Sequence, residues 1–178
     1  MFTEQILKSI LSLKSFASTG RSSVPALAGI HISVDAKSKT ITAMATDCYA
    51  AARMVISVPE CTGDSWSQNI SIATLNAALA TVKASGQAVS SFPESQMPGF
   101  PANVAIAIDT FVNSDDTTEH GDFNAKYLGA LAKINVGGDK SARWTIRTVD
   151  HATRTGLAAT ANYGSYEAAV VVMPLTRR

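Results

Sequence analysis

Residues 29–58 read GIHISVDAKSKTITAMATDCYAAARMVISV and decide the fold. Apolar residues alternate with their neighbours over 29–35, 40–46 and 50–58, a period of two that predicts three strands. Only short polar stretches separate these segments, so we expect a meander in which each strand pairs antiparallel with the next. His31 alternates with isoleucines in the first segment, which places it on the outer face of the sheet.

Helical patterns flank this meander. Over 3–18 apolar residues recur every three or four positions, which predicts an amphipathic helix with Thr3 as its N-cap. A second helix is predicted over 74–84, capped by Thr74 and ended by Gly86. A helix followed by a strand meander indicates an α+β fold rather than βαβ winding.

The C-terminal third repeats the order of the N-terminal third. A helix is predicted over 124–134, and its apolar stripe is expected to be buried; the stripe consists of Tyr127, Leu128, Leu131 and Ile134. Three strands are predicted to follow, over 142–149, 153–160 and 167–174. The repeat is one of element order, without convincing identity between residues.

A connector separates the two repeats. Residues 90–102 contain three prolines and a glycine, residues 103–112 predict a strand, and an acidic loop runs to residue 121. We therefore divide the chain into an N-terminal half (1–89), a connecting segment (90–121) and a C-terminal half (122–178).

Composition excludes several classes of protein. Of 178 residues 46% are hydrophobic and 16% are charged, which is enough apolar material for a core and rules out wholesale disorder. No apolar run approaches the ~20 residues of a membrane helix, and no signal peptide is recognisable. Cys48 and Cys61 form neither a disulfide framework nor a metal-binding pair, so a reducing, cytoplasmic setting is expected.

Charge is unevenly distributed along the chain, although the net charge is only +1. Residues 1–60 carry six basic and four acidic groups, residues 61–121 one and six, and residues 122–178 eight and four. Basic side chains occur on or beside every predicted helix: Lys8, Lys14, Arg21, Lys83, Lys126 and Lys133. Helical lysines without interleaved aromatic residues suit sequence-independent contact with duplex phosphates, and they equally suit a solvated surface.

Motifs for catalysis and for cofactors are absent from the sequence. It contains neither phosphate-binding glycine loop, G-x-G-x-x-G or G-x-x-x-x-G-K-[ST], and no G-x-S-x-G nucleophile elbow. The tract 115–120 has residue types that bind metals but lacks the spacing of a calcium loop. We expect no cofactor, no metal and no catalytic residue; a small enzyme built around His120 or His151 remains an alternative.

Five segments, in order along the chain, resemble the bacterial sliding clamp, the beta subunit of DNA polymerase III. They are VPALAGI (24–30), ATDCYAAA (45–52), FPESQMP (92–98), FNAKYL (123–128) and AVVVMPL (169–175). They are similar to clamp segments P-[AIV]-L-x-G-[IV], A-T-D-G-H-R-L-A, the F/Y-P connector between domains, F-N-x-x-Y-[LV] and the terminal V-V-M-P stretch. The chain is shorter than a three-domain clamp, as in clamp-like proteins of phages and prophages.

The resemblance implies a DNA-clamp fold, with repeated helix-plus-antiparallel-strand units and the helices on one face of the sheets. Clamps form closed rings in which helices line the hole, so the lysines and Arg21 would contact double-stranded DNA independently of sequence. A short chain would close the ring by self-association. With about a dozen lining helices per ring, three helices per chain would require four copies and two would require six.

The resemblance also implies a pocket that binds a peptide of a polymerase or another clamp partner. The matching positions are Thr46, Cys48, Tyr49, Ala50, Pro98, Val171, Val172, Met173, Pro174 and Leu175. The family's Gly-His-Arg is replaced by residues 48–50, Cys-Tyr-Ala, and its last Met by Leu175, so the pocket is expected to differ in shape.

The leading hypothesis is a non-enzymatic replication processivity factor that encircles duplex DNA as a homo-oligomeric ring and tethers a polymerase. The alternative is a clamp-fold interaction protein that binds polymerase or host replication or transcription partners without encircling DNA. The lysines distinguish these hypotheses, because encirclement requires them to share one surface.

Overall fold

The structure is a computed structural model that describes residues 1–18, 24–118, 122–138, 142–151 and 154–174. The strands are β1 (Gly29–Asp35), β2 (Thr40–Thr46), β3 (Ala50–Ser57), β4 (Trp66–Ser71), β5 (Thr145–His151), β6 (Arg154–Tyr163) and β7 (Tyr166–Val172). The α-helices are α1 (Glu4–Ser12), α2 (Ile72–Ser85), α3 (Asn103–Val112) and α4 (Ala125–Leu131). Two short 3-10 helices, η1 (Leu13–Phe16) and η2 (Pro25–Leu27), complete the described elements.

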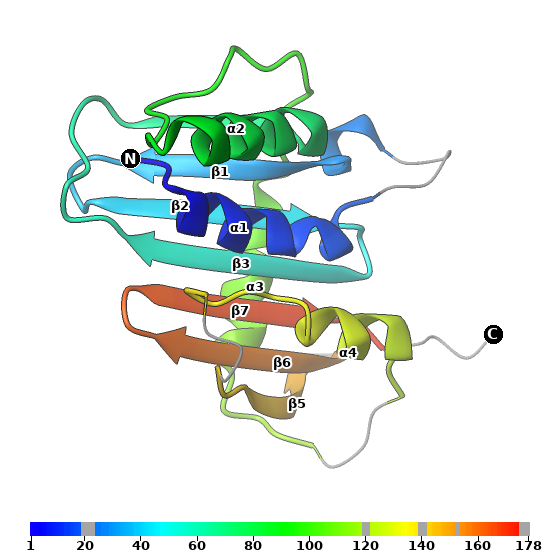
Figure 1. Ribbon diagram of the computed structural model, residues 1–178. Coiled ribbons are helices and arrows are strands. Elements are labelled where there is room, and N and C mark those ends of the chain that lie inside the picture. The colour runs from blue at the N-terminus through cyan, green and yellow to red at the C-terminus, as the bar shows by residue number, and fades with distance from the viewer. Residues whose placement is uncertain (19–23, 119–121, 139–141, 152–153, 175–178) are drawn as a thin grey trace.

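All seven described strands form one antiparallel sheet in the order β4-β1-β2-β3-β7-β6-β5. Helices α1, α2 and α4 cover one face of this sheet, and α3 crosses the other face (Figure 1). The molecule therefore has three layers. The predicted α+β class, with helices over an antiparallel sheet, is confirmed, and helix α3 is an addition behind the sheet.

The two predicted meanders join through their last strands. β3 pairs antiparallel with β7, with Ala50 opposite Val172 and Ile56 opposite Tyr166. Because β1–β3 and β5–β7 are both meanders, this pairing relates them by an approximate two-fold rotation perpendicular to the sheet. Such a rotation keeps the preceding helices, α1 and α4, on the same face, as Figure 1 shows. The boundaries proposed for three segments of the chain stay a prediction.

Side-chain alternation gives the sheet two apolar faces. Ile30, Ile32 and Val34 of β1 are buried under the helix layer, together with the apolar stripe of α1. On the opposite face a smaller cluster joins Ile108 and Phe111 of α3 to residues of the second meander. The sheet is therefore buried on both sides where α3 crosses it.

Capping residues define the predicted helix ends. The Thr3 hydroxyl accepts a hydrogen bond from the amide of Ile6 (3.3 Å), as predicted for the first helix. The second helix starts two residues earlier than predicted, because Ser71 is its cap and accepts from the amide of Thr74 (3.0 Å). Gly86 ends it in a left-handed conformation (φ 70°), which glycine adopts without a steric penalty.

Residues 103–112 form helix α3, so the predicted strand is wrong. Val104, Ile106 and Ile108 alternate as in a strand, but Val104, Ile108 and Phe111 also follow the helical spacing of four and three. Packing on the sheet selects the helical stripe. Ile108 and Phe111 are buried, whereas Ile106 is 67% exposed.

Two smaller differences concern β4 and α4. Strand β4 was not predicted, because only Trp66 and Ile70 interrupt its polar sequence and it lies at the sheet edge. Leu128 was expected to be buried with the α4 stripe but is 42% exposed, since α4 has only seven residues and turns Tyr127 and Leu131 inward. Among the described residues, no helix is long and apolar enough to span a membrane.

Candidate functional site

An apolar pocket of about 370 Å³ opens beside α3, at the end of the sheet where β2 and β3 meet. One wall is the loop that joins β2 to β3, with Cys48 and Tyr49, and another is the end of β7, with Val171 and Met173. Side chains of α3 form the opposite wall. The pocket is open enough and apolar enough to accept a short apolar side chain or peptide.

The pocket brings together six of the ten residues predicted to bind a partner peptide. They are Thr46, Cys48, Tyr49, Ala50, Val171 and Met173. Sequence reasoning missed six further lining residues: Leu27, Ala51, Pro101, Asn103, Val104 and Ala107. Four of these missed residues, at positions 101, 103, 104 and 107, lie on α3 or just before it. The signal that would have found them is the helical spacing of residues 104, 108 and 111.

The other predicted pocket residues lie elsewhere. Val172 is fully buried in the cluster under the helix layer, because successive strand residues face opposite sides and Val171 already faces α3. Pro98 lines a separate hollow near the start of α2. Pro174 follows β7 without lining the pocket, and Leu175 lies outside the described residues.

The β2–β3 loop is held by a compact set of hydrogen bonds. One carboxylate oxygen of Asp47, Oδ1, accepts from the amides of Tyr49 (3.1 Å) and Ala50 (3.0 Å). The Thr46 hydroxyl donates to the carbonyl of Ala50 (2.8 Å) and accepts from the amide of Cys48 (3.2 Å). These contacts hold Cys48 at φ 75°, a left-handed conformation that disfavours residues with a Cβ.

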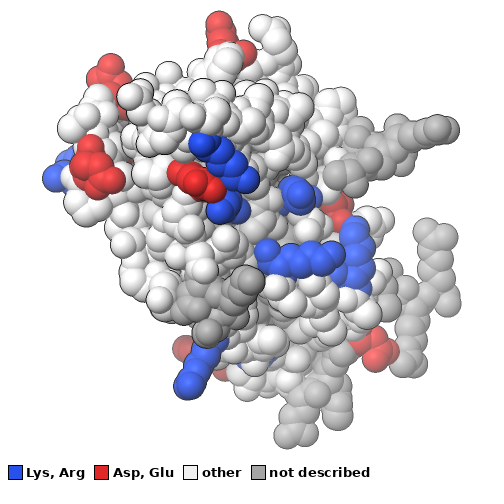
Figure 2. Space-filling model, in the orientation of Figure 1, with Lys and Arg blue, Asp and Glu red and all other residues white. Residues whose placement is uncertain are grey.

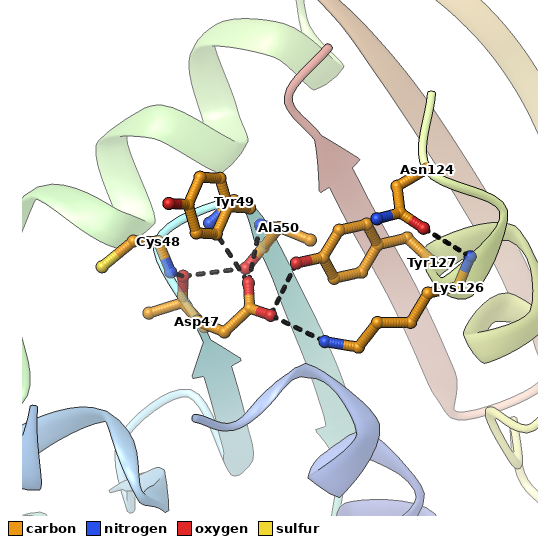
Figure 3. Close-up of polar contacts among 8 residues, drawn as sticks. Asp47, Cys48, Tyr49, Ala50, Asn124, Lys126 and Tyr127 are labelled. Carbon is orange, nitrogen blue, oxygen red and sulfur yellow. Dashed lines mark hydrogen bonds and ion pairs between the residues drawn. The ribbon is translucent and has the colours of Figure 1, made fainter. Parts of the chain in front are cut away.

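The second oxygen of the same carboxylate reaches α4. Asp47 Oδ2 accepts from the hydroxyl of Tyr127 (2.6 Å) and lies 3.3 Å from Nζ of Lys126 (Figure 3). Burial, and then the hydrogen bond to Asp47, raise the pKa of the Tyr127 hydroxyl, so it remains a proton donor at neutral pH. The loop that lines the pocket beside α3 is thus bonded to α4, which lies on the other face of the sheet.

Close packing positions α3 against the sheet. A Cβ on Gly156 of β6 would lie 2.5 Å from the ring of Phe111, so glycine at this position lets the helix approach. Arg53 of β3 pairs with Asp109 of α3 at 2.6 Å. These contacts fix the wall of the pocket.

The helix layer carries the predicted DNA-contacting lysines. α1, η1, α2 and α4 together contain four lysines (Lys8, Lys14, Lys83 and Lys126) and one acidic residue, Glu4. Lys133 lies two residues after the end of α4, and all five lysines are exposed. Figure 2 shows basic side chains gathered across the middle of this face. The structure therefore places the five lysines in one layer; Arg21 lies outside the described residues.

Two of these lysines have acidic neighbours. Lys8 pairs with Glu4 at 2.8 Å, one helical turn away, and Lys126 pairs with Asp47. The hydrogen bond with Lys8, and more weakly the charge of Lys83, lower the pKa of Glu4. Both lysines are well exposed, so each pair contributes little to stability and leaves the ammonium available to a phosphate.

The enzyme alternative was built on His120 or His151, whereas His31 was expected on the outer face of the sheet. His31 points to the face of the sheet opposite Ile30 and Ile32, which confirms the predicted outer face; its ring is half-buried because it stacks on Phe100, with ring centroids 5.1 Å apart. His120 and the side chain of His151 lie outside what the structure describes. Within the described ranges no cluster of three metal-ligating side chains occurs.

The arrangement of helices and strands is similar to that of solved sliding clamps. The beta subunit of DNA polymerase III from Pseudomonas aeruginosa matches 99% of this chain with a TM-score of 0.62 at 12% identity. The beta clamp of Helicobacter pylori matches 99% with a TM-score of 0.62 at 11% identity, and the beta subunit of Thermotoga maritima 99% with 0.58 at 11%.

The chain has the sliding-clamp fold. The matches cover 66%, 65% and 64% of those three clamps, so this chain spans slightly less than two thirds of their length. No protein-family model and no curated protein sequence matches the chain. The similarity to the clamps is therefore one of fold, at 11–12% identity.

Proposed function

We propose that this chain is a sliding-clamp-like processivity factor that encircles duplex DNA as a homo-oligomeric ring and tethers a polymerase. The observation that carries the proposal is that a basic surface and an apolar pocket lie on opposite faces of one clamp-fold sheet. Exposed lysines occupy the helix-covered face, and an apolar pocket occupies the other face. The first suits phosphates of any sequence, and the second suits a peptide anchor.

The helix face supports weak contact with a polyanion. Helices α1, α2 and α4 and the 3-10 helix η1 carry four lysines against one glutamate, whereas α3 carries one aspartate and no basic residue. A ring needs no tight DNA contact, because topology retains the partner while sequence-independent contacts allow sliding. Lys8, Lys14, Lys83, Lys126 and Lys133 are the proposed contacts, with Arg21 beside them.

Closure of the ring requires self-association. α1, α2 and α4 share one face, and three helices per copy correspond to a ring of four copies if the ring has about a dozen lining helices. Light scattering after size exclusion tests this directly. A discrete species near four times 18.7 kDa supports the ring, and a monomer both alone and on DNA contradicts it.

The second candidate is a clamp-fold interaction protein that does not encircle DNA. The ion pairs of Lys8 with Glu4 and Lys126 with Asp47 favour it, because they offset part of the positive charge on the helix face. In this case the pocket would bind a polymerase or other replication or transcription peptide, while the helix face would serve solubility. Peptide binding by a monomer that ignores duplex DNA is the result that selects this candidate.

A further inference from the structure

The loop that lines the pocket and the helix that carries Lys126 are joined through one carboxylate. Asp47 is largely buried, with 10% of its side chain exposed. Its Oδ1 holds the loop amides of Tyr49 and Ala50, and its Oδ2 holds Tyr127 and Lys126. In Figure 3 Tyr127 and Lys126 reach Asp47 from α4, and Cys48 lies on the side of the loop away from α4.

We propose that Asp47 is a positioning residue that couples the pocket to α4, so that a polyanion which draws Lys126 away loosens the pocket loop. The proposal rests on the proposed function, because it assigns regulation to the same pocket and the same lysine. Asp47 itself does not line the pocket, so its role is to set the conformation of Cys48, Tyr49 and Ala50.

Local strain gives this coupling its physical basis. Cys48 is held at a positive φ, and the bonds that hold the loop include the two amides on Asp47 Oδ1. When a buried carboxylate loses a cationic partner, its negative charge is less well compensated. The geometry of its hydrogen bonds to the two loop amides then changes. The carbonyl of Tyr49 also accepts from the amide of Met173 (2.8 Å), so loop movement reaches the β7 wall of the pocket.

The expected coupling is small and reciprocal. Lys126 is 61% exposed and 3.3 Å from the carboxylate, which corresponds to an exposed ion pair. Its loss should weaken pocket binding by about two- to fivefold, and a peptide in the pocket should weaken polyanion binding by the same factor. Tyr127 is the stronger tether, because its hydrogen bond is 2.6 Å long and the residue is only 5% exposed.

Cys48 offers a reporter of the loop. Cys48 is exposed, so a trifluoromethyl thiol reagent can reach it, whereas Cys61 is buried. In a Cys61→Ala background Cys48 is the one cysteine left to label. The ¹⁹F NMR signal of the label then reports the conformation of the loop. Asp47→Asn is the sharpest variant. Its amide oxygen still accepts from the two loop amides, but its NH₂ group cannot accept from Tyr127 or Lys126.

The proposal predicts that Asp47→Asn and Tyr127→Phe shift or broaden the Cys48 signal, and that the double variant shows no further change. Lys126→Ala should give a smaller shift in the same direction. The matched controls, Tyr166→Phe and Lys14→Ala, should leave the signal in place. Thermal unfolding of each variant is recorded alongside. Lower melting temperatures with an unmoved Cys48 signal would mean a merely structural role and would overturn the proposal.

Duplex DNA supplies the second arm of the experiment. Added at low salt, a short duplex should move the Cys48 signal of the Lys14→Ala variant but not that of Lys126→Ala, with binding followed separately by anisotropy of labelled DNA. Binding without movement of the Cys48 signal overturns the coupling. No binding contradicts the proposed function instead, and the Lys126→Ala shift in the absence of DNA then decides the coupling alone.

Discussion

The helix-covered face and the α3 face of the sheet share the same strands but differ in the kind of contact they can make. On the helix face the lysines are exposed, and two of them, Lys8 and Lys126, pair with Glu4 and with the largely buried Asp47. On the α3 face the residues around the pocket are apolar and partly enclosed. The first favours binding that is weak, general and sensitive to salt, and the second favours a selective anchor.

The comparison teaches that one small domain can separate retention on DNA from recognition of a partner. The two faces communicate through the β2–β3 loop, which lines the pocket with Cys48 and Tyr49 and contacts α4 through Asp47. Substitutions on one face should therefore spare the other, except at this loop.

The largest expected effect is on the packing of α3 against the sheet. Gly156→Ala places a Cβ 2.5 Å from the Phe111 ring and should destabilise the protein by about 1–3 kcal/mol while displacing α3. Urea unfolding measures the change. Gly129→Ala is the matched control, because its Cβ meets no atom within 4 Å and alanine favours α4 by about 0.5–1 kcal/mol. Equal effects of the two substitutions would contradict the close seating of α3.

The next effect concerns the pocket alone. Met173→Ala removes a lining side chain and should weaken binding of a display-selected peptide about tenfold, since a buried anchor contributes about 1–2 kcal/mol. Isothermal titration measures the affinity. Met44→Ala removes a half-buried methionine of β2 outside the pocket and should leave binding unchanged. Selected peptides that bind both variants equally would place their site elsewhere.

The helix face should respond through salt dependence. The Lys8→Ala/Lys126→Ala double variant should weaken duplex binding uniformly across sequences and reduce the slope of log K against log salt by about two. Lys37→Ala/Lys39→Asn removes two exposed lysines from the β1–β2 turn and keeps a residue that tolerates the positive φ at position 39 (56°). If this control lowers the slope as much, the helix lysines have no special role.

The smallest effect tests the contact between the faces by pH. The raised pKa of Tyr127 means that the unfolded chain loses this proton first, so stability is intact below about pH 10 and falls as pH rises further. Tyr127→Phe should show a shallower fall above pH 10 in the free energy of unfolding, measured by urea titration. Parallel curves for the two proteins would show that the tyrosine does not couple to folding.

Much of this architecture was predictable from sequence, because local patterns record it. The alternation over residues 29–58, the Thr3 cap and the order of the second meander all reflect local geometry, and the structure confirms them. The pairing of β3 with β7 joins segments more than a hundred residues apart, so no local pattern reports it.

The pocket was only partly predictable for the same reason. Eight lining residues lie in segments that resemble clamps and six of these were predicted, but the α3 wall was hidden by the double periodicity of Val104, Ile106 and Ile108. Val172 was misplaced because a run of apolar residues does not reveal which of them faces which side of a doubly covered strand. The Asp47 bond to Tyr127 spans 80 positions, and nothing in either segment indicates the other.

Retention on DNA of defined topology tests the central proposal most directly. The chain is assembled on nicked circular duplex DNA, washed at high salt, and compared before and after a restriction enzyme linearises the circle. An encircling clamp should stay on the circle at high salt and leave after linearisation, because topology rather than charge retains it. Equal loss from circular and linear DNA at high salt would contradict encirclement and leave the clamp fold in the service of partner binding alone.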